Sequence, residues 1–393
     1  MKNQKKKSVH RRNFFKTLTA GGIGAILIPE SVKAASSPIQ QENEKPKTNI
    51  GDAKKYPRNE HSMPGKYPAK VVRVDHKKCV INDELQADAA YEMLEKGMLE
   101  LTGSKNLKKA WRQFVGPKDI IGLKVNPVAG KTLTTSHEVV KAVIAQLEDA
   151  GIPQKNIVIW DRREFQLHET GYTSENYPGI KIIGTEQKDE EGSFYGKDGK
   201  LYGEKMIDKD WYYWADVDGE YDEYTIPYMV NGGKYSYYSK IATQMVDKII
   251  NIPILKNAGS SVTLCMKNIA YGVVSNTSRL HKNLWAETTA EVCAFPPVRD
   301  KVVLNIVDGL KGCFNGGPGA NPQFFTNYKT MLLGTDAVAV DRVGYDIVVQ
   351  KRIDEGLQTE ESEKGRNFLK LATALELGEE EIEKIDLNKI ELT

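Results

Sequence analysis

The sequence predicts an α/β fold, with a largely parallel sheet flanked by helices and an aromatic-rich, β-containing insertion. Short apolar runs of strand length alternate along the chain with amphipathic segments of helical period. Residues 118–161 read as strand, helix and strand, with lengths suited to a right-handed parallel crossover. A tyrosine-dense segment then interrupts the alternation, which later resumes. We therefore expect a single α/β domain over residues 69–393, with the insertion at residues 185–240.

In the first half of this domain, residues 71–74, 119–125, 156–160 and 180–183 are apolar runs expected to form strands. Residues 85–101 carry apolar side chains near helical spacing. A second helix is expected to begin at the capping-box sequence TSHE, residues 135–138, and to stop at Gly151 and Pro153. In the second half, strands are expected at residues 246–252, 302–307 and 331–333, and helices at residues 284–293, 337–349 and 368–377.

The insertion holds ten of the eighteen tyrosines, together with Trp211 and Trp214. Turn sequences such as KDGK at residues 197–200 indicate β-hairpins. An aromatic surface of this kind can stack on sugars or peptides. Aromatic side chains are also the usual filler of small β structures, and we favour that packing role.

The N-terminal segment, residues 1–34, resembles a twin-arginine export signal. It contains RRNFFK at residues 11–16 after a lysine-rich run, then a short apolar stretch at residues 17–28 and small residues near a cleavage point. The alternative is a basic tail that binds nucleic acid or membrane. The resemblance implies the twin-arginine translocase as a partner, a periplasmic or extracellular location and a cargo that folds before export. Residues 35–68 are polar and lack a hydrophobic period, so we expect a flexible linker there.

The net charge and the positions of the cysteines argue against several classes of function. The formal net charge of +2 becomes −5 once residues 1–34, with eight basic and one acidic side chain, are removed. Nucleic-acid binding is therefore not expected, and no apolar run in the remaining chain is long enough for a stable membrane span. The four cysteines are far apart, and no Cys-x-x-Cys pair is present, so we expect no cysteine-ligated iron–sulfur cluster. Disulfides and buried free thiols both remain open.

Polar residues follow five of the expected strands. They are Lys124 with Asn126, Asp161, Asn251, Asp308 and Asp336. In open α/β sheets, ligands bind in the crevice at the carboxyl ends of the strands. One polar residue at the end of a strand is ordinary, because loops are polar. Polar residues at the ends of five strands together predict a shared functional crevice.

We assign roles to these residues and their neighbours as hypotheses. Carboxylates suit a hard divalent cation, Mg²⁺ or Ca²⁺, and the metal candidates are Asp161, Asp308, Asp336 and Asp341. Asp336 also fits a helix N-cap. The substrate-binding candidates are Lys124, Asn126, Thr135, Asn251, Lys256, Asn268, Gly316 and Gly317. The catalytic candidates are His281, Lys267 and Asp161, with His281 as the group that moves protons.

The same stretches carry a family resemblance. They are residues 122–161, NIPILK at 251–256, MKN at 266–268, DG at 308–309 with GGP at 316–318, and GTDAVAVD at 334–341. Together they resemble the family catalogued as domain of unknown function 362, over most of residues 118–350. The resemblance implies no established reaction. Some members carry ferredoxin-like cysteine clusters, which this chain lacks. The family often has Thr-Thr-His-Pro where this chain has TTSHE at residues 134–138, which weakens any role for His137.

Three functions compete at this point. The first is an enzyme that acts on a small anionic or polar substrate with a divalent metal at the strand ends. The second is a non-catalytic extracytoplasmic binding protein whose aromatic insertion forms much of the ligand surface. The third is a redox protein that acquires its cofactor before export.

Overall fold

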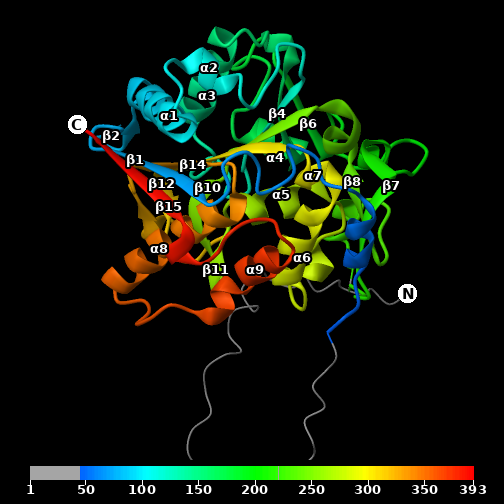
Figure 1. Cartoon of the computed structure of the whole chain (residues 1–393). Coiled ribbons are helices and arrows are strands. Elements are labelled where there is room, and N and C mark those ends of the chain that lie inside the picture. Colours follow the sequence, from blue (N-terminus) through cyan, green and yellow to red (C-terminus); the bar gives the residue numbers. More distant parts are fainter. Residues whose placement is uncertain (1–44, 220) are drawn as a thin grey trace, which may run out of the picture. The chain divides into compact units, whose positions relative to one another are not determined.

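The computed structural model describes residues 45–219 and 221–393 (Figure 1). The expected signal peptide and the first part of the expected linker lie outside these residues. From residue 45 onward, the segment predicted as a linker packs against the α/β domain. It contains a 3-10 helix at Ile50–Lys55, the side chains of Ala53 and Met63 are buried in the core, and Thr48 forms a β-bridge with Ala215.

The domain is built on one mixed sheet in the order β15-β1-β14-β12-β9-β4-β5-β6, with β10, β11 and β13 attached beside it. β14 runs antiparallel to β1 and β12, whereas all other adjacent pairs in that order are parallel. The strands are β1 (Lys70–His76), β4 (Ile121–Lys124), β5 (Ile157–Arg163), β6 (Lys181–Glu186), β9 (Lys248–Asn251), β10 (Ile254–Ala258), β11 (Ser261–Val262), β12 (Val302–Cys313), β13 (Phe325–Thr326), β14 (Thr330–Gly334) and β15 (Asp386–Leu392). The largely parallel sheet predicted from the sequence is therefore confirmed.

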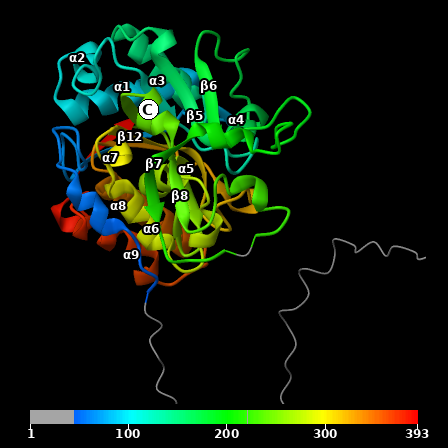
Figure 2. The same ribbon diagram turned by 90° about the vertical axis from the view of Figure 1, so that its right-hand side faces the viewer.

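Helices cover both faces of the sheet (Figures 1 and 2). One layer holds α1 (Ala87–Thr102), α2 (Leu107–Trp111) and α3 (His137–Asp149). The other holds α5 (Cys265–Val273), α6 (Trp285–Glu291), α8 (Ala337–Asp354) and α9 (Glu363–Ala374). Two short helices, α4 (Glu164–Glu169) and α7 (Pro296–Arg299), complete the set. Successive strand residues face opposite sides of a sheet. Accordingly, Val72 and Val74 of β1 belong to the apolar core under α1 and α3, and Val71 belongs to the core under α8.

The aromatic insertion forms a separate antiparallel ribbon of β7 (Ile207–Trp214) and β8 (Tyr235–Ser239), preceded by a turn closed by a bridge between Tyr195 and Leu201. Tyr213 and Tyr238 are fully buried. Their hydroxyl groups donate hydrogen bonds to the Glu291 carboxylate and to the Val292 carbonyl oxygen. These two tyrosines therefore pack the ribbon onto the domain, whereas Tyr224 is 73% exposed.

Several elements have no counterpart among the predicted ones, and three of these help to build the sheet or the region around it. β15 has the sequence DLNKIEL, with charged side chains along an exposed edge, and it pairs in parallel with β1. α5 is buried at almost every position and has only nine residues, so it is short for a helix to be recognised from its sequence. β10 continues directly from β9 after Ile252 and Pro253 and pairs with β12. A short hairpin of β2 (Val80–Ile81) and β3 (Glu84–Leu85) lies at the edge of the domain.

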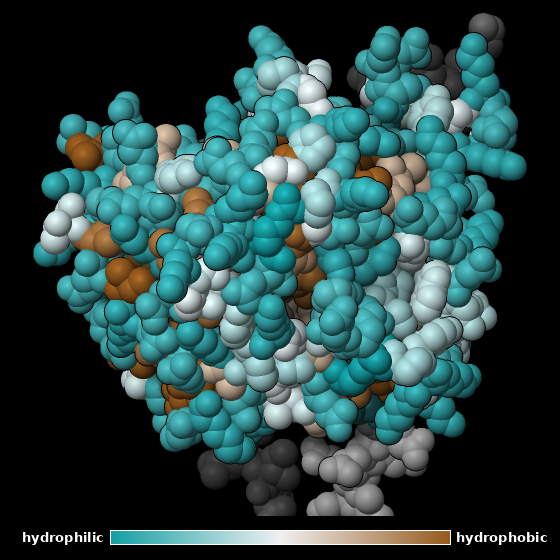
Figure 3. Space-filling view, turned by 45° about the horizontal axis from the view of Figure 1, so that its top comes forward, coloured by the Kyte–Doolittle hydropathy of each residue, from teal (hydrophilic) through white to brown (hydrophobic). Residues whose placement is uncertain are grey.

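The face shown in Figure 3 is mostly hydrophilic, and its apolar residues appear in small separate patches. Among the residues that the structure describes, no helix combines the length and apolar character needed to cross a bilayer. All four cysteines, Cys79, Cys265, Cys293 and Cys313, are buried free thiols.

Candidate functional site

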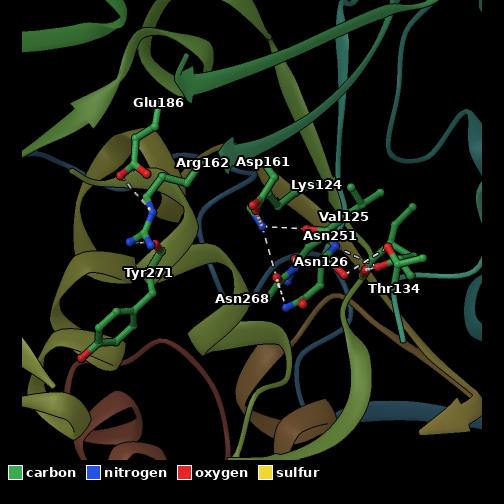
Figure 4. A network of polar contacts seen from close by, with 12 residues as sticks. Lys124, Val125, Asn126, Thr134, Asp161, Arg162, Glu186, Asn251, Asn268 and Tyr271 are labelled. Carbon is green, nitrogen blue, oxygen red and sulfur yellow. Dashed lines mark hydrogen bonds and ion pairs between the residues drawn. The ribbon is translucent and has the colours of Figure 1, made fainter. Parts of the chain in front are cut away.

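A polar pocket lies where β4, β5 and β9 end. Their parallel register places Lys124 beside Trp160 on one side and beside Asn251 on the other. Asp161 and Arg162 are the next two residues of β5 after Trp160 (Figure 4). Residues of α5 form another side of the pocket. The cavity has a volume of about 110 Å³. The crevice expected at the strand ends therefore exists, and it is small.

Lys124 and Asp161 form a buried ion pair at 2.5 Å between Nζ and Oδ1. The Lys124 ammonium also donates to the Val125 carbonyl oxygen at 2.8 Å and to Asn268 Oδ1 at 3.1 Å. Burial lowers the pKa of Lys124, and the Asp161 charge opposes that effect. Gly272 makes room for the pair, because a Cβ there would lie 2.3 Å from Lys124 Cε.

Four asparagines connect this ion pair to the sheet. Asn126 Nδ2 donates to Asn268 Oδ1 at 2.9 Å, and Asn268 Nδ2 donates to Asn251 Oδ1 at 2.8 Å. Asn251 Nδ2 donates in turn to Asn305 Oδ1 at 3.0 Å. A lysine ammonium can only donate, so the contacts of Lys124 and Lys256 require Asn268 and Asn126 to turn their oxygens toward the lysines. The network therefore fixes the orientation of the amides beside the cavity.

Two further lysines line the cavity. Lys256 of β10 is fully buried and donates to Asn126 Oδ1 at 2.9 Å. Burial, with repulsion from Lys124 and Lys267, lowers the pKa of Lys256 to about 7. Lys267 of α5 lies 5.5 Å from the centre of the Tyr271 ring and 5.9 Å from that of Trp285, and burial lowers its pKa to about 8. Within the described part of the chain, no carboxylate forms an ion pair with either amine.

His281 lies on the cavity wall after a 3-10 turn at Ser278–Leu280. Its Nδ1 lies 3.1 Å from the Thr277 carbonyl oxygen, which can only accept, so Nδ1 carries the proton and Nε2 the lone pair. Although His281 keeps part of its surface in water, the partial burial of its ring against the cavity wall, reinforced by the charges of Lys267 and Arg162, lowers its pKa to about 4. At neutral pH the ring is therefore an uncharged proton acceptor.

An arginine pair forms another part of the wall. The carboxylate of Glu186, which is buried at the end of β6, pairs with Arg162 at 3.3 Å and with Arg163 at 3.0 Å. Arg162 also donates to the Tyr271 carbonyl oxygen at 3.1 Å (Figure 4). It donates to the Thr277 hydroxyl as well. Arg162, Arg163 and Glu186 are not among the residues predicted for the site. The signal was available, since both arginines directly follow Asp161 at a strand end.

Seven of the fourteen predicted site residues meet in this pocket. Its walls include Lys124, Asn126, Asp161, Lys256, Lys267, Asn268 and His281. Asn251 lies behind them in the asparagine network. Thr135 supports the wall, because its hydroxyl donates to the Ile252 carbonyl oxygen at 2.7 Å and accepts from the Asn126 N–H at 2.9 Å.

The two glycines predicted to bind substrate, Gly316 and Gly317, lie in a loop that packs beside the cavity and do not line it themselves. A Cβ on Gly317 would lie 1.8 Å from the Asn257 carbonyl oxygen, so the loop packs tightly against β10. Gly316 has a φ of +73°, which favours glycine. The loop reaches the cavity through Pro318.

The four aspartates predicted to hold a metal do not meet. Asp308 accepts from the N–H and the hydroxyl of Ser136, at 2.7 and 2.6 Å, on the face covered by α3. Asp336 is the N-cap of α8 and accepts from the Ala339 N–H at 2.9 Å. Asp341 accepts from the N–H groups of Cys265 and Met266, at 2.6 and 2.9 Å, at the start of α5.

The geometry of the sheet explains this separation. β14 is antiparallel to β12, so Asp336 continues toward the amino edge of the parallel strands. Asp308 follows Ile306 by two positions and therefore shares its face, opposite to that of α5. In residues 45–219 and 221–393, no group of three or more His, Cys, Asp or Glu side chains is arranged to hold a metal ion. The expected metal site is therefore not assembled from the aspartates proposed for it.

The part of the chain that carries most of the pocket has a family match. Residues 214–346 match the family model of Domain of unknown function (DUF362). This match supports the DUF362 resemblance of the sequence, over a shorter range than expected, and it includes Lys256, Lys267 and His281. A comparison with curated proteins finds no match. The structure is similar to a crystal structure of a Thermotoga maritima protein, with a TM-score of 0.34 and 9% identity, over 68% of this chain and 60% of that one. The chain thus spans less than two thirds of that protein's length.

Proposed function

We propose that the protein is an enzyme that binds a small organic anion in this pocket and moves protons with His281 and the buried lysines. The observation that carries the proposal is the position of Lys267. Its side chain lines the cavity, is half-buried and has no carboxylate partner among the described residues. Burying an unpaired charge is costly, and an anionic ligand would remove that cost.

The balance of charge around the cavity supports the same conclusion. Lys124, Lys256, Lys267 and Arg162 line it, and the one carboxylate on its wall, Asp161, is already paired with Lys124. The volume of about 110 Å³ is below the roughly 300 Å³ typical of pockets for larger ligands, so a ligand of few atoms fits best. A carboxylate or phosphate group is the chemistry that several ammonium groups recognise.

The sequence also suggested a divalent cation, and the residues of the pocket do not fit one. Hard cations take several oxygen ligands, with free carboxylates among them. Here one paired carboxylate faces several cationic groups, which repel a second cation. The proposed chemistry therefore uses no metal.

Calorimetric binding of inorganic phosphate and of propionate tests the anion site. We expect both probes to bind the wild type and Lys267→Met to bind at least tenfold more weakly, because it loses the unpaired cation. Lys282→Met is the matched control, because it removes the same charge at an exposed position next to His281 in the sequence. The proposal fails if neither anion binds the wild type at millimolar concentration, or if the two variants bind equally.

We also propose that the twin-arginine translocase exports the chain to a periplasmic or extracellular location. The support is the RRNFFK sequence at residues 11–16 and the small residues near position 34. Fractionation of cells that express the full chain tests it. Changing Arg11 and Arg12 to lysine keeps the charge, and we expect it to hold the protein inside the cell. Equal export of the double variant and the wild type would overturn the proposal.

A further inference from the structure

Besides the ion-paired Lys124, the cavity is lined by two lysine amines with different surroundings. Lys267 is held over aromatic rings near His281, whereas Lys256 lies on β10, with Asn126 Oδ1 as its one hydrogen-bond acceptor among the described residues. A lysine that is withdrawn from water or lies beside other cations is a recognised arrangement for a nucleophilic amine. Lys256 has this arrangement, because it is fully buried and feels the positive charges of Lys124 and Lys267.

We propose that Lys256 forms an imine with the carbonyl group of a small oxo acid, while Lys267 and Arg162 hold the acid's carboxylate. This inference rests on the proposed anion site and names its substrate class.

The two lysines differ in protonation state, so one can act as the nucleophile and the other can bind the carboxylate. With a pKa of about 7, about half of Lys256 is uncharged at neutral pH and has a free electron pair. With a pKa of about 8, Lys267 remains mostly charged and can hold the carboxylate. An ordinary lysine, with a pKa near 10.4, is uncharged only about once in 2,500 molecules at pH 7. Lys256 thus has on the order of 10³ times more reactive amine than a surface lysine.

The step balances without an oxidant or a reductant. The Lys256 nitrogen donates its electron pair to the carbonyl carbon, a C–N bond forms, and the carbonyl oxygen takes a proton to give a carbinolamine. The C–O bond then breaks, and the oxygen leaves as water with the two protons that began on the amine. The product is a C=N bond to Lys256. His281 Nε2, which carries a lone pair, is the group on the cavity wall suited to accept a proton from the carbon next to the imine.

Reductive trapping tests the inference. The full chain is incubated with pyruvate and sodium cyanoborohydride, and the modified lysine is located by peptide mass spectrometry. We expect Lys256 to be labelled at least about tenfold faster than the exposed Lys282. Its labelling rate should rise through pH 7 and then level off, whereas the rate at Lys282 should keep rising to higher pH.

Two variants and one binding measurement separate the outcomes. Lys256→Met should lose the trapped adduct, and Lys256→Arg, which keeps a donor for Asn126, should lose it as well. Phosphate or propionate binding to the wild type, without preferential labelling of Lys256 by pyruvate, would overturn the imine and leave the anion site standing. Absence of both binding and trapping would overturn both. Labelling of Lys256 at the same rate as Lys282 would also overturn the imine, whether or not phosphate and propionate bind.

Discussion

Lys124 Nζ and Asp161 Oδ1 lie 2.5 Å apart, and both side chains are almost fully buried, at 1% and 5% exposure. The pair joins β4 to β5 at the carboxyl ends of these parallel strands. Gly272 of α5 packs directly against the Lys124 side chain. A charge enclosed in this way depends on its partner, because water does not replace the lost contact. The pair is therefore the element on which the geometry of the pocket depends.

The first prediction is that Asp161→Asn destabilises the fold by about 3–5 kcal/mol, since it leaves the Lys124 charge buried and unpaired. The free energy of unfolding, from urea denaturation, measures the effect. The double variant Lys124→Met with Asp161→Leu should recover much of the loss, because it removes both charges. An exposed pair provides the control. Lys384 and Glu381 are 2.7 Å apart and more than half exposed, so Glu381→Gln should change little. Equal losses at the buried and exposed pairs would contradict the prediction.

The second prediction concerns the pH dependence that Lys256 gives to stability. Its pKa falls from 10.5 in the unfolded chain to about 7 in the fold, so between these values the native state binds fewer protons than the unfolded state. The contribution of Lys256 to the free energy of unfolding therefore rises with pH from 7 to 10.5. Lys256→Met removes this term. We expect the variant to be more stable than the wild type at pH 7, by about 1–4 kcal/mol, with the difference shrinking toward pH 10.

Urea denaturation of both proteins at several pH values between 7 and 10 measures this difference. Groups other than Lys256 contribute equally to the two proteins and cancel in the comparison. A difference in stability that stays constant over this range would show that Lys256 keeps its ordinary pKa in the fold.

The positions of three predicted residues of the site follow from the direction of the strands alone. Lys124, Asp161 and Asn251 each end an apolar run, and parallel neighbours in register bring such ends to one edge. That inference needs only the parallel direction of these strands, which the strand–helix–strand rhythm indicates. The same reasoning cannot place Asp336, because nothing in its local sequence shows that β14 runs antiparallel.

Other parts of the site depend on contacts between distant residues. Asp308 faces α3 and not α5 because of its register within β12, and a shift of one residue would reverse that. Glu186 acquires its role only when β6 lies beside β5 and meets Arg163. α5 was not predicted because it has only nine residues, which is shorter than the window over which a helical period is recognised in a sequence.

The third prediction is that Lys267→Met raises the pKa of His281 from about 4 toward its ordinary 6.5. Burial is the larger cause of the low value and remains in the variant, so we expect a partial rise of up to about one pH unit. Titration of the imidazole ring nitrogens by NMR measures the midpoint and also reports the tautomer. Lys282→Met is again the control, because it removes an exposed charge. An unchanged midpoint in Lys267→Met would place the two groups too far apart to share a substrate.

The last prediction links the packing of α5 to the chemistry of the pocket. An alanine Cβ at Gly272 would lie 2.3 Å from Lys124 Cε and 2.7 Å from Lys124 Nζ, distances that no Cβ tolerates. Either the lysine leaves Asp161 or α5 moves away from β4. We expect Gly272→Ala to destabilise the fold by about 1–3 kcal/mol.

Gly272→Ala should also weaken phosphate and propionate binding, because α5 carries Lys267. Gly51→Ala serves as the control, since Gly51 has no atom within 4 Å of the added carbon. Calorimetry and urea denaturation of the two variants separate the effects. If Gly272→Ala lowered stability while anion binding stayed at the wild-type level, the cavity beside Lys124 would not be where the anion binds.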